Sequence, residues 1–290
     1  MKKIYDAFLF FNELDLLEIR LSMLDAYVDF FVISECDYTF SGNKKPFYFE
    51  ENKHLFSKFL HKIIHIKNHN SNETENLINI QTGKRKIIFD NIIKYYNTIK
   101  NSAETDFGKL HWCREILHRE FVSLGLSECN DEDIIIFGDL DELPNPEIVK
   151  NIKNLSLNQN KYTLYQNYHN YFINNLLNIE WMGNVIVKYR TIKLDSLDNL
   201  RRNRSSYIKL ENGGWHLSFM GGIDRIKHKL ECYGHQEFNN DFIKSNIEVK
   251  INQNSDLFNR NIASKIIDIY NYYPYNIIQL IKTKYPYLIK

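Results

Sequence analysis

The chain has 290 residues and a formal net charge of +1; 43% of its residues are hydrophobic and 14% are aromatic. This apolar content can bury a core, so the composition excludes a disordered chain. The balanced charge excludes a general nucleic-acid binder, which needs a basic excess. The length predicts one large domain or two small ones. The 35 asparagines indicate the codon bias of an AT-rich genome, microbial or viral, and carry no functional signal.

No stretch reaches the roughly 20 apolar residues that a membrane-spanning helix needs. The two N-terminal lysines resemble the start of a signal peptide, but Asp6 interrupts the apolar run and no small-residue cleavage site follows. The four cysteines are widely spaced and show no metal-binding pattern, so we expect reduced thiols. These features predict a cytoplasmic chain without a membrane anchor.

The first elements alternate between strand and helix patterns. Residues 5–11 form a short apolar run typical of a buried strand, and residues 13–27 carry leucines at helical spacing. Residues 29–34 return to strand character, and residues 62–67 form another strand candidate. Strands and a helix joined by short connections predict an α/β sheet. Residues 69–105 are mostly polar and are the hardest to assign, with one apolar helix-like piece around residues 87–96.

The rest of the chain continues the alternation. Helical periodicity covers residues 107–126 and 223–232. Strand-like runs cover residues 133–137, 162–173 and 185–194. The tail from residue 262 to residue 289 is rich in Ile and Tyr, and its pattern predicts helical segments that break at Pro274 and Pro286.

The sharpest local signal is the acidic turn Gly138 to Pro144, which follows the strand predicted at 133–137. In open α/β sheets, ligands bind at the carboxyl ends of strands. Asp139 and Asp141 are two apart in an extended segment and so project to the same side, and Gly138 leaves room for a ligand backbone. Carboxylates at this density suit Mg²⁺ or Mn²⁺, which would neutralise a diphosphate. The alternative is a solvated acidic turn that caps the next helix.

Two later segments carry weaker signals. Residues 213–219 read GGWHLSF, and His216 is either a third metal ligand or a structural histidine. His235 and Glu237 lie close together in sequence and predict either a general base or a hydrogen-bonded helix end. The chain has no P-loop and no Gly-rich dinucleotide motif, which argues against ordinary NTPase and dinucleotide enzymes.

These motifs together resemble glycosyltransferase family 17, which includes the enzyme that adds the bisecting N-acetylglucosamine of N-glycans. The resemblance runs from about residue 4 to about residue 240 and is carried, in the family's order, by YDAFLFFNELDLLEIRLSMLDAYVDFFVISE, TFSGNKKPFYFEEN, GDLDELP, GGWHLSF and KLECYGHQEF. It implies a single α/β, GT-A-like (Rossmann-like) nucleotide-sugar transferase domain. We expect a mixed, mainly parallel central sheet flanked by helices.

The resemblance also implies a domain organisation and a chemistry. Residues 1–260 would form the catalytic domain, with donor binding in about 1–145 and the acceptor and metal-completing part in about 146–260. Residues 261–290 would form an aromatic helical tail packed on that domain. The expected reaction is inverting transfer of a sugar, N-acetylglucosamine in the family's known case, from a UDP-sugar to a glycan hydroxyl. A divalent cation, Mn²⁺ or Mg²⁺, is the expected cofactor.

The site residues follow from matching the motifs position by position. The metal ligands implied are Asp139, Asp141 and His216. The donor-binding residues implied are Glu35, Thr39, Lys45, Arg114 and Asp139. The acceptor-binding residues implied are Tyr168, Tyr171, Trp215 and His235. The general base is expected to be Glu237, then Glu142, with Asp224 as a third candidate.

Two other functions remain open from the sequence. A sugar nucleotidyltransferase also uses acidic strand ends and Mg²⁺, although its Gly-rich basic phosphate loop is missing here. A protein that binds nucleotide-sugars or glycans without turnover is the non-enzymatic alternative. The expected partners are a UDP-sugar donor and a glycan or glycoconjugate acceptor, with no nucleic acid. Sequence alone predicts no oligomeric state.

Overall fold

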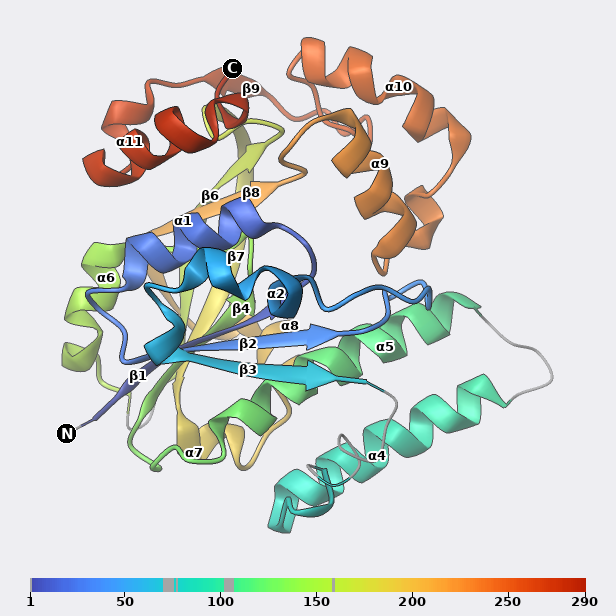
Figure 1. Ribbon diagram of the computed structural model, residues 1–290, viewed down its shortest axis with the longest axis vertical. Coiled ribbons are helices and arrows are strands. Elements are labelled where there is room, and N and C mark those ends of the chain that lie inside the picture. Colours follow the sequence, from blue (N-terminus) through green and yellow to red (C-terminus); the bar gives the residue numbers. More distant parts are fainter. Residues whose placement is uncertain (1, 70–75, 77, 102–106, 158–159) are drawn as a thin grey trace.

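The computed structural model describes residues 2–69, 76, 78–101, 107–157 and 160–290. The chain forms a mixed α/β structure in which one curled sheet carries helices on both faces (Figure 1). The expected α/β class is therefore confirmed.

The strand order in the sheet is β3-β2-β1-β4-β7-β6-β8-β5, and β9 pairs with β7. The strands of the described residues are β1 Ile4–Phe10, β2 Phe30–Cys36, β3 Ile63–Asn68, β4 Ile134–Asp139, β5 Glu142–Pro144, β6 Tyr162–Asn170, β7 Asn175–Lys188, β8 Ile208–Ser218 and β9 Ser264–Ile266.

The helices lie between and after these strands. They are α1 Leu14–Leu24, α2 Tyr48–Asn52, α4 Gly83–Lys100, α5 Phe107–Phe121, α6 Pro146–Asn151, α7 Tyr189–Ile192, α8 Leu197–Arg202, α9 Ile223–Cys232, α10 Asp241–Asn252 and α11 Tyr275–Lys284. Several short 3₁₀ turns connect them, including Arg204–Ser206 after α8 and Gln236–Phe238 after α9.

The sheet is mixed, but it is parallel only in part. Strands β3, β2, β1 and β4 run parallel to one another, and β6 is parallel to β8. The pairs β4/β7, β6/β7, β5/β8 and β7/β9 are antiparallel. The described strands thus make four parallel and four antiparallel pairs, so the expected parallel majority is not found. A four-residue connection from β6 to β7 explains the difference, because so short a link joins only antiparallel neighbours.

Alternating residues of β1 build the two faces of the core. Ile4 and Phe8 lie in the cluster that includes α1, α6 and α11, whereas Tyr5 and Ala7 lie in the cluster that includes α7 and α8. This alternation is the period of a strand buried on both sides. Asp6 lies on the α1 side and is fully buried, where it meets a charged partner described below.

Three segments differ from the sequence prediction. Strand β7 begins ten residues before the predicted start at 185 and ends at Lys188, where α7 takes over. The structure adds α10, for which the sequence offered no clear pattern. Strand β9 lies in the tail that was predicted to be helical, so that prediction is wrong for these three residues. The helix-like piece predicted around residues 87–96 lies within α4, whereas residues 70–75, 77 and 102–105 lie outside the described residues.

The C-terminal segment packs on the sheet and on α1. Strand β9 pairs with β7, and Ile277, Ile278 and Ile281 of α11 belong to the same buried cluster as Leu16 of α1 (Figure 1). Tyr273 stacks on Trp215 of β8 with 4.9 Å between ring centroids. These contacts fix the end of the chain to the body that carries the site.

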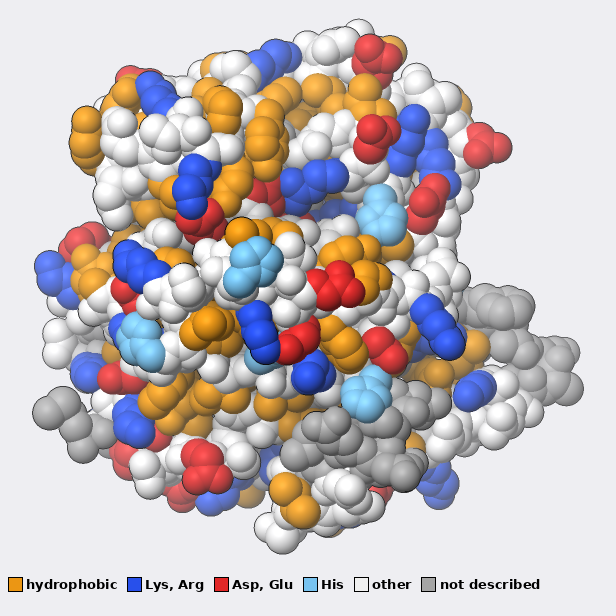
Figure 2. Space-filling view, viewed as in Figure 1, with side chains coloured by type: hydrophobic (Ala, Val, Ile, Leu, Met, Phe, Trp, Pro, Cys, Tyr) orange, Lys and Arg blue, Asp and Glu red, His pale blue; other side chains and the backbone are white. Residues whose placement is uncertain are grey.

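Basic and acidic side chains are interspersed over the face shown in Figure 2. No described helix combines the length and the hydropathy of a membrane span. The four cysteines are free thiols.

Candidate functional site

A cavity of about 610 Å³ opens where strands β1, β4 and β8 end. Leu9 of β1, Asp139 of β4 and Ser218 of β8 line it near their carboxyl ends, and side chains from α5 and α9 complete it. Its position agrees with the rule that α/β sheets bind ligands at their strand ends. Its size lies within the range of small-molecule sites.

Strand pairing brings the acidic turn to His216. Glu142 of β5 lies opposite His216 of β8, and the amide of Leu217 donates a 2.8 Å hydrogen bond to the carbonyl of Asp141. As a result, Nε2 of His216 lies 3.6 Å from Oδ1 of Asp141, and both residues line the cavity. The structure therefore brings together two of the three predicted metal ligands, which are 75 positions apart in sequence.

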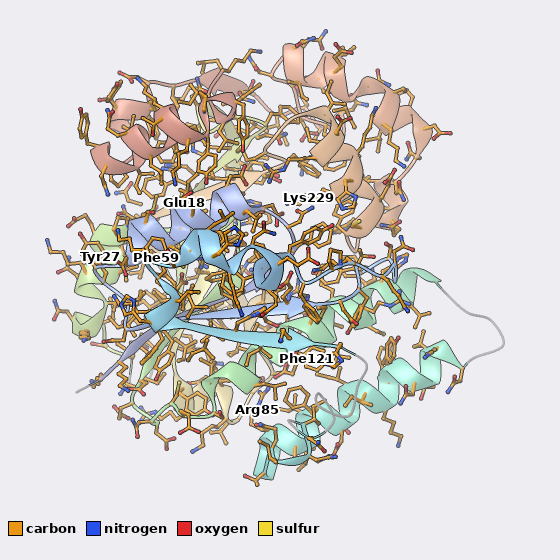
Figure 3. The ribbon with its side chains drawn as sticks, in the orientation of Figure 1. Glu18, Tyr27, Phe59, Arg85, Phe121 and Lys229 are labelled. Atoms are coloured by element: carbon orange, nitrogen blue, oxygen red, sulfur yellow. The ribbon has the colours of Figure 1, made fainter. Side chains whose placement is uncertain are left out.

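Lys229 of α9 completes this group. Figure 3 labels Lys229 on α9. Its ammonium donates a 2.9 Å hydrogen bond to Oδ2 of Asp141 and lies 3.8 Å from Glu13. Although burial alone would raise the pKa of Asp141, the charge of Lys229 and the neighbouring His216 hold that pKa well below its usual range. Burial would lower the pKa of Lys229, but Asp141 and Glu13 raise it above its ordinary value. Both groups are charged at neutral pH.

Asp139 also lines the cavity but has a different partner. Arg201 of α8 forms an ion pair with Asp139 and a bidentate pair with Glu142 at 2.8 and 2.9 Å. Glu142 is fully buried and also accepts hydrogen bonds from the indole of Trp181 and the amide of Asp139. Burial acts to raise the pKa of Glu142, yet Arg201 holds it below the ordinary value. Glu142 is thus an anchor beneath the turn.

A buried arginine fixes the backbone of the acidic turn. Arg20 of α1 is fully buried and makes a bidentate pair with Asp6, at 2.7 and 2.8 Å. Its Nη1 also donates to the carbonyls of Asp139, Leu140 and Glu142 at 2.8, 3.0 and 2.9 Å. The carboxylates that face the cavity therefore sit on a turn whose carbonyls are already satisfied.

The side chains present fit a divalent cation that binds substrate phosphates. Asp141 and His216 offer an oxygen and a nitrogen, while the buried Oδ1 of Asp139 and Nδ1 of His216 have no hydrogen-bond partner. Across the described ranges, no group of three or more His, Cys, Asp or Glu side chains is arranged around one metal position. Magnesium-type ions commonly take one or two protein ligands and complete their shell with phosphate and water. Asp141 and His216 are side chains of the kind that such a shell uses.

An aromatic layer supports His216. Its ring stacks on Trp181 of β7 with centroids 4.2 Å apart and meets Tyr168 of β6 edge-on at 4.7 Å. The guanidinium of Arg204 lies 5.2 Å from the same indole and lines the cavity. Burial and the nearby Arg201 lower the pKa of Arg204 to about 10, so it stays charged at neutral pH.

The predicted donor-binding residues divide into two groups. Thr39, Lys45 and Asp139 line the cavity. Glu35 is fully buried and does not line it, but accepts a 3.2 Å hydrogen bond from Lys45 and so holds that lysine in place. Arg114 also lies outside the lining, where it donates to the carbonyl of Phe40.

The predicted acceptor and base residues divide in the same way. Tyr168 and His235 line the cavity, whereas the other five residues do not. Trp215 points into the core, Tyr171 is buried with its hydroxyl bonded to Ser255, Glu142 is buried under the turn, and Glu237 and Asp224 are exposed on the surface.

Comparison with known families decides the class of the protein. The sequence model of glycosyltransferase family 17 matches residues 1–103 and 75–264. The chain belongs to glycosyltransferase family 17. A search of curated proteins and a search of solved structures each found no match. As a family 17 glycosyltransferase, the protein acts on a sugar donor and an acceptor.

Several cavity residues of this glycosyltransferase were missed by sequence reasoning. They include Trp112, Glu115, Trp181, Arg201, Arg204, Lys229, Phe238, Phe258 and Arg260. The sequence shows a basic run at residues 201–204 and a helical pattern that includes Lys229. Neither pattern indicates which residues these basic side chains contact in the fold. Trp112, Phe238 and Phe258 carry no local signal at all, since an aromatic side chain is equally typical of a core.

Proposed function

We propose that this glycosyltransferase is a metal-dependent inverting enzyme that transfers a sugar from a UDP-sugar to a glycan hydroxyl. The observation that carries the proposal is the Asp141–His216 pair, whose side chains lie 3.6 Å apart in the wall of the cavity. Lysine and arginine side chains line the same cavity. The donor sugar we propose is N-acetylglucosamine, which rests on the family resemblance alone. The match to a glycosyltransferase family favours this reaction over that of a sugar nucleotidyltransferase.

In this proposal Asp141 and His216 hold Mn²⁺ or Mg²⁺ beside the donor diphosphate. The bound cation supplies Lewis-acid stabilisation of the charge that develops on the leaving diphosphate. Lys229 keeps Asp141 ionised and oriented through its 2.9 Å hydrogen bond. Trp181 and Tyr168 fix the plane of the His216 ring. Side chains held in this way need little reorganisation during the reaction.

The cations of the chain supply further donor contacts. Lys45 and Arg204 line the cavity, and each is positioned by a neighbour, Glu35 and Trp181 respectively. A diphosphate between these groups and the cation would have its charge neutralised from several directions. In an inverting transfer the acceptor oxygen attacks from the side opposite this diphosphate, so the acceptor needs a separate part of the cavity.

UDP release from UDP-N-acetylglucosamine, with and without Mn²⁺, tests the proposal. We expect Mn²⁺-dependent release by the wild-type chain and a loss of about 100-fold or more in Asp141→Asn, which cannot support the cation in the same way. Asp90→Asn, on the exposed side of α4, is the matched control and should keep wild-type rates. Wild-type rates in Asp141→Asn, or release that is indifferent to the metal, would contradict the metal assignment.

A further inference from the structure

A group of aromatic side chains forms part of the cavity lining beyond the acidic turn. Trp112 of α5 meets His235 edge-on with ring centroids 4.6 Å apart, and Tyr233 lies 5.7 Å from the same ring. Phe238 packs against His235 at 5.9 Å and against Phe258 at 4.3 Å. All five line the cavity, and none of them is fully buried. Aromatic faces left open in a ligand cavity suit the apolar CH faces of a sugar ring.

One residue of this aromatic group carries a reactive side chain in a fixed orientation. Nδ1 of His235 lies 2.7 Å from Oε1 of Glu237. A carboxylate in this position holds the proton on Nδ1 of a neutral imidazole and leaves Nε2 with its lone pair. Nε2 of His235 has no hydrogen-bond partner among the described residues. The ring contacts with Trp112 and Phe238 restrict its rotation.

The carboxylates of the cavity lining have cationic partners. Asp139 pairs with Arg201, Asp141 with Lys229, and Glu115 with Arg119. Glu13 lies 3.8 Å from Lys229, the lysine that also bonds Asp141. A carboxylate beside a cation is a weakened proton acceptor, because the cation stabilises its ionised form.

The two other histidines of the lining are also engaged. Nε2 of His118 lies 3.0 Å from the carbonyl of Ser34, and burial lowers the pKa of His118 to about 3. His216 faces Asp141. Nδ1 of His216 also lacks a hydrogen-bond partner, but it is buried. Among the described residues of the lining, His235 is therefore the exposed imidazole whose second nitrogen is free to accept a proton.

We propose that His235 is the general base of the transfer, with Glu237 as the residue that positions it, and that the acceptor is a sugar seated on the surrounding aromatic rings. This inference rests on the proposed function. The acceptor hydroxyl gives its proton to Nε2 of His235 while its oxygen forms a bond to the anomeric carbon of the donor. The bond from that carbon to the diphosphate breaks, and its electron pair leaves with UDP. His235 then returns its proton to solvent.

The groups that face His235 are few. Glu237 lies on the adjacent 3₁₀ turn, and Tyr233 lies two residues before His235. From α5, Glu115 lies against Gly234, where an added Cβ would be 2.4 Å from its Oε2. Glu115 is paired with Arg119, so Glu237 is the carboxylate that bonds the imidazole.

Hydrolysis of UDP-N-acetylglucosamine tests the base without a known acceptor, because water then takes the acceptor's place. We expect His235→Gln to release UDP about 100-fold or more slowly than wild type, with unchanged UDP affinity in calorimetry. Free imidazole should restore part of the rate to His235→Ala, since it can occupy the vacated space. Glu237→Gln should reduce the rate less and displace the acid limb of the pH–rate profile.

His54→Gln, an exposed histidine outside the lining, is the matched control and should behave as wild type. Wild-type hydrolysis in His235→Gln, or an unaltered pH profile in both variants, would overturn the assignment of the base while leaving the proposed function intact. Lack of UDP release and of UDP binding by the wild-type chain itself would overturn both.

Discussion

Among the residues that the structure describes, Arg204 differs from the other cations of the cavity lining in forming no ion pair. Arg201, Arg119 and Lys229 each form an ion pair, as do Lys45 and Arg260. For Arg204, the described residues provide the indole of Trp181 as its close contact. Glu142 and Asp139 act on the Arg204 guanidinium only through space, and burial, which removes its hydration, lowers its pKa. Its position is therefore suited to an anionic ligand such as a diphosphate.

Removing this guanidinium should weaken donor binding specifically. We expect Arg204→Gln to lower the affinity for UDP by roughly 10- to 100-fold, the range of a hydrogen bond to a charged group. Arg202→Gln is the control, because Arg202 is largely exposed and bonds Asp198. Calorimetry with UDP compares the two variants. Equal affinities in both would show that Arg204 does not contact the nucleotide.

Asp141 links the site to the acid stability of the protein. Its pKa lies below the ordinary value in the folded chain, since Lys229 and His216 outweigh the effect of burial. Such a group stabilises the fold above its ordinary pKa, and this contribution is lost as the pH falls below that value. Urea unfolding at pH 7 and pH 3 should therefore show a smaller loss of stability in Asp141→Asn than in wild type. A variant that loses as much as wild type would refute the linkage.

At the scale of elements, the acidic turn shows what a local pattern can and cannot predict. Asp139 and Asp141 both line the cavity, and Glu142 is buried. Strand alternation does not explain this, because residues 140 and 141 form a turn and Leu140 between the aspartates lines the cavity as well. The partner of Glu142, Arg201, is 59 residues away, so no local pattern reveals that the glutamate is an anchor. Gly138 was expected to leave room for a ligand. Instead an added Cβ would lie 2.2 Å from Asn184 and 2.7 Å from Glu142, so protein fills that space.

Strand β8 makes the same point. Its alternation places His216 toward the cavity and Trp215 toward the core, where Trp215 stacks on Tyr273. Period-two reasoning applied to β8 would have separated these two neighbours. The stacking partner itself could not be predicted, because Tyr273 comes from a segment that follows β9.

Because Arg20 bonds three carbonyls of the acidic turn, its substitution should affect ligand binding as well as stability. Arg20→Lys should cost roughly 3–5 kcal/mol, as expected when a buried pair loses a partner or its geometry, and should also weaken metal-dependent UDP binding. Ile278→Ala, in α11 and remote from the cavity lining, is a control expected to lose a similar stability. If both variants bind UDP equally well below their melting temperatures, Arg20 has a structural role alone.

At the scale of the whole molecule, sequence reasoning was most accurate where neighbours in sequence are neighbours in space. Strands β1 and β2 with α1 between them were predicted within a few residues. The antiparallel part of the sheet was not, because β5 leaves β4 and pairs with β8 at the far edge. That pairing depends on tertiary contacts, which single-sequence patterns do not contain.

The C-terminal segment should contribute to the stability of the entire fold. Ile278 is almost completely buried in the cluster shared with α1, whereas Tyr275, one turn earlier, is 69% exposed. Ile278→Ala should therefore lower the free energy of unfolding by about 2–5 kcal/mol, and Tyr275→Ala by less than about 0.5 kcal/mol. Urea denaturation measures both. Similar values for the two variants would mean that α11 is only loosely attached.

The cavity lining begins at Leu9 and ends at Arg260, so one site draws on nearly the whole chain. During synthesis, a growing chain that has not yet added β8 and α9 lacks His216 and Lys229, the two neighbours of Asp141. Such a chain carries the acidic turn without its neutralising partners. The complete lining therefore exists only after the chain through Arg260 has folded, so ligand binding in the cavity would report the folding of the whole site.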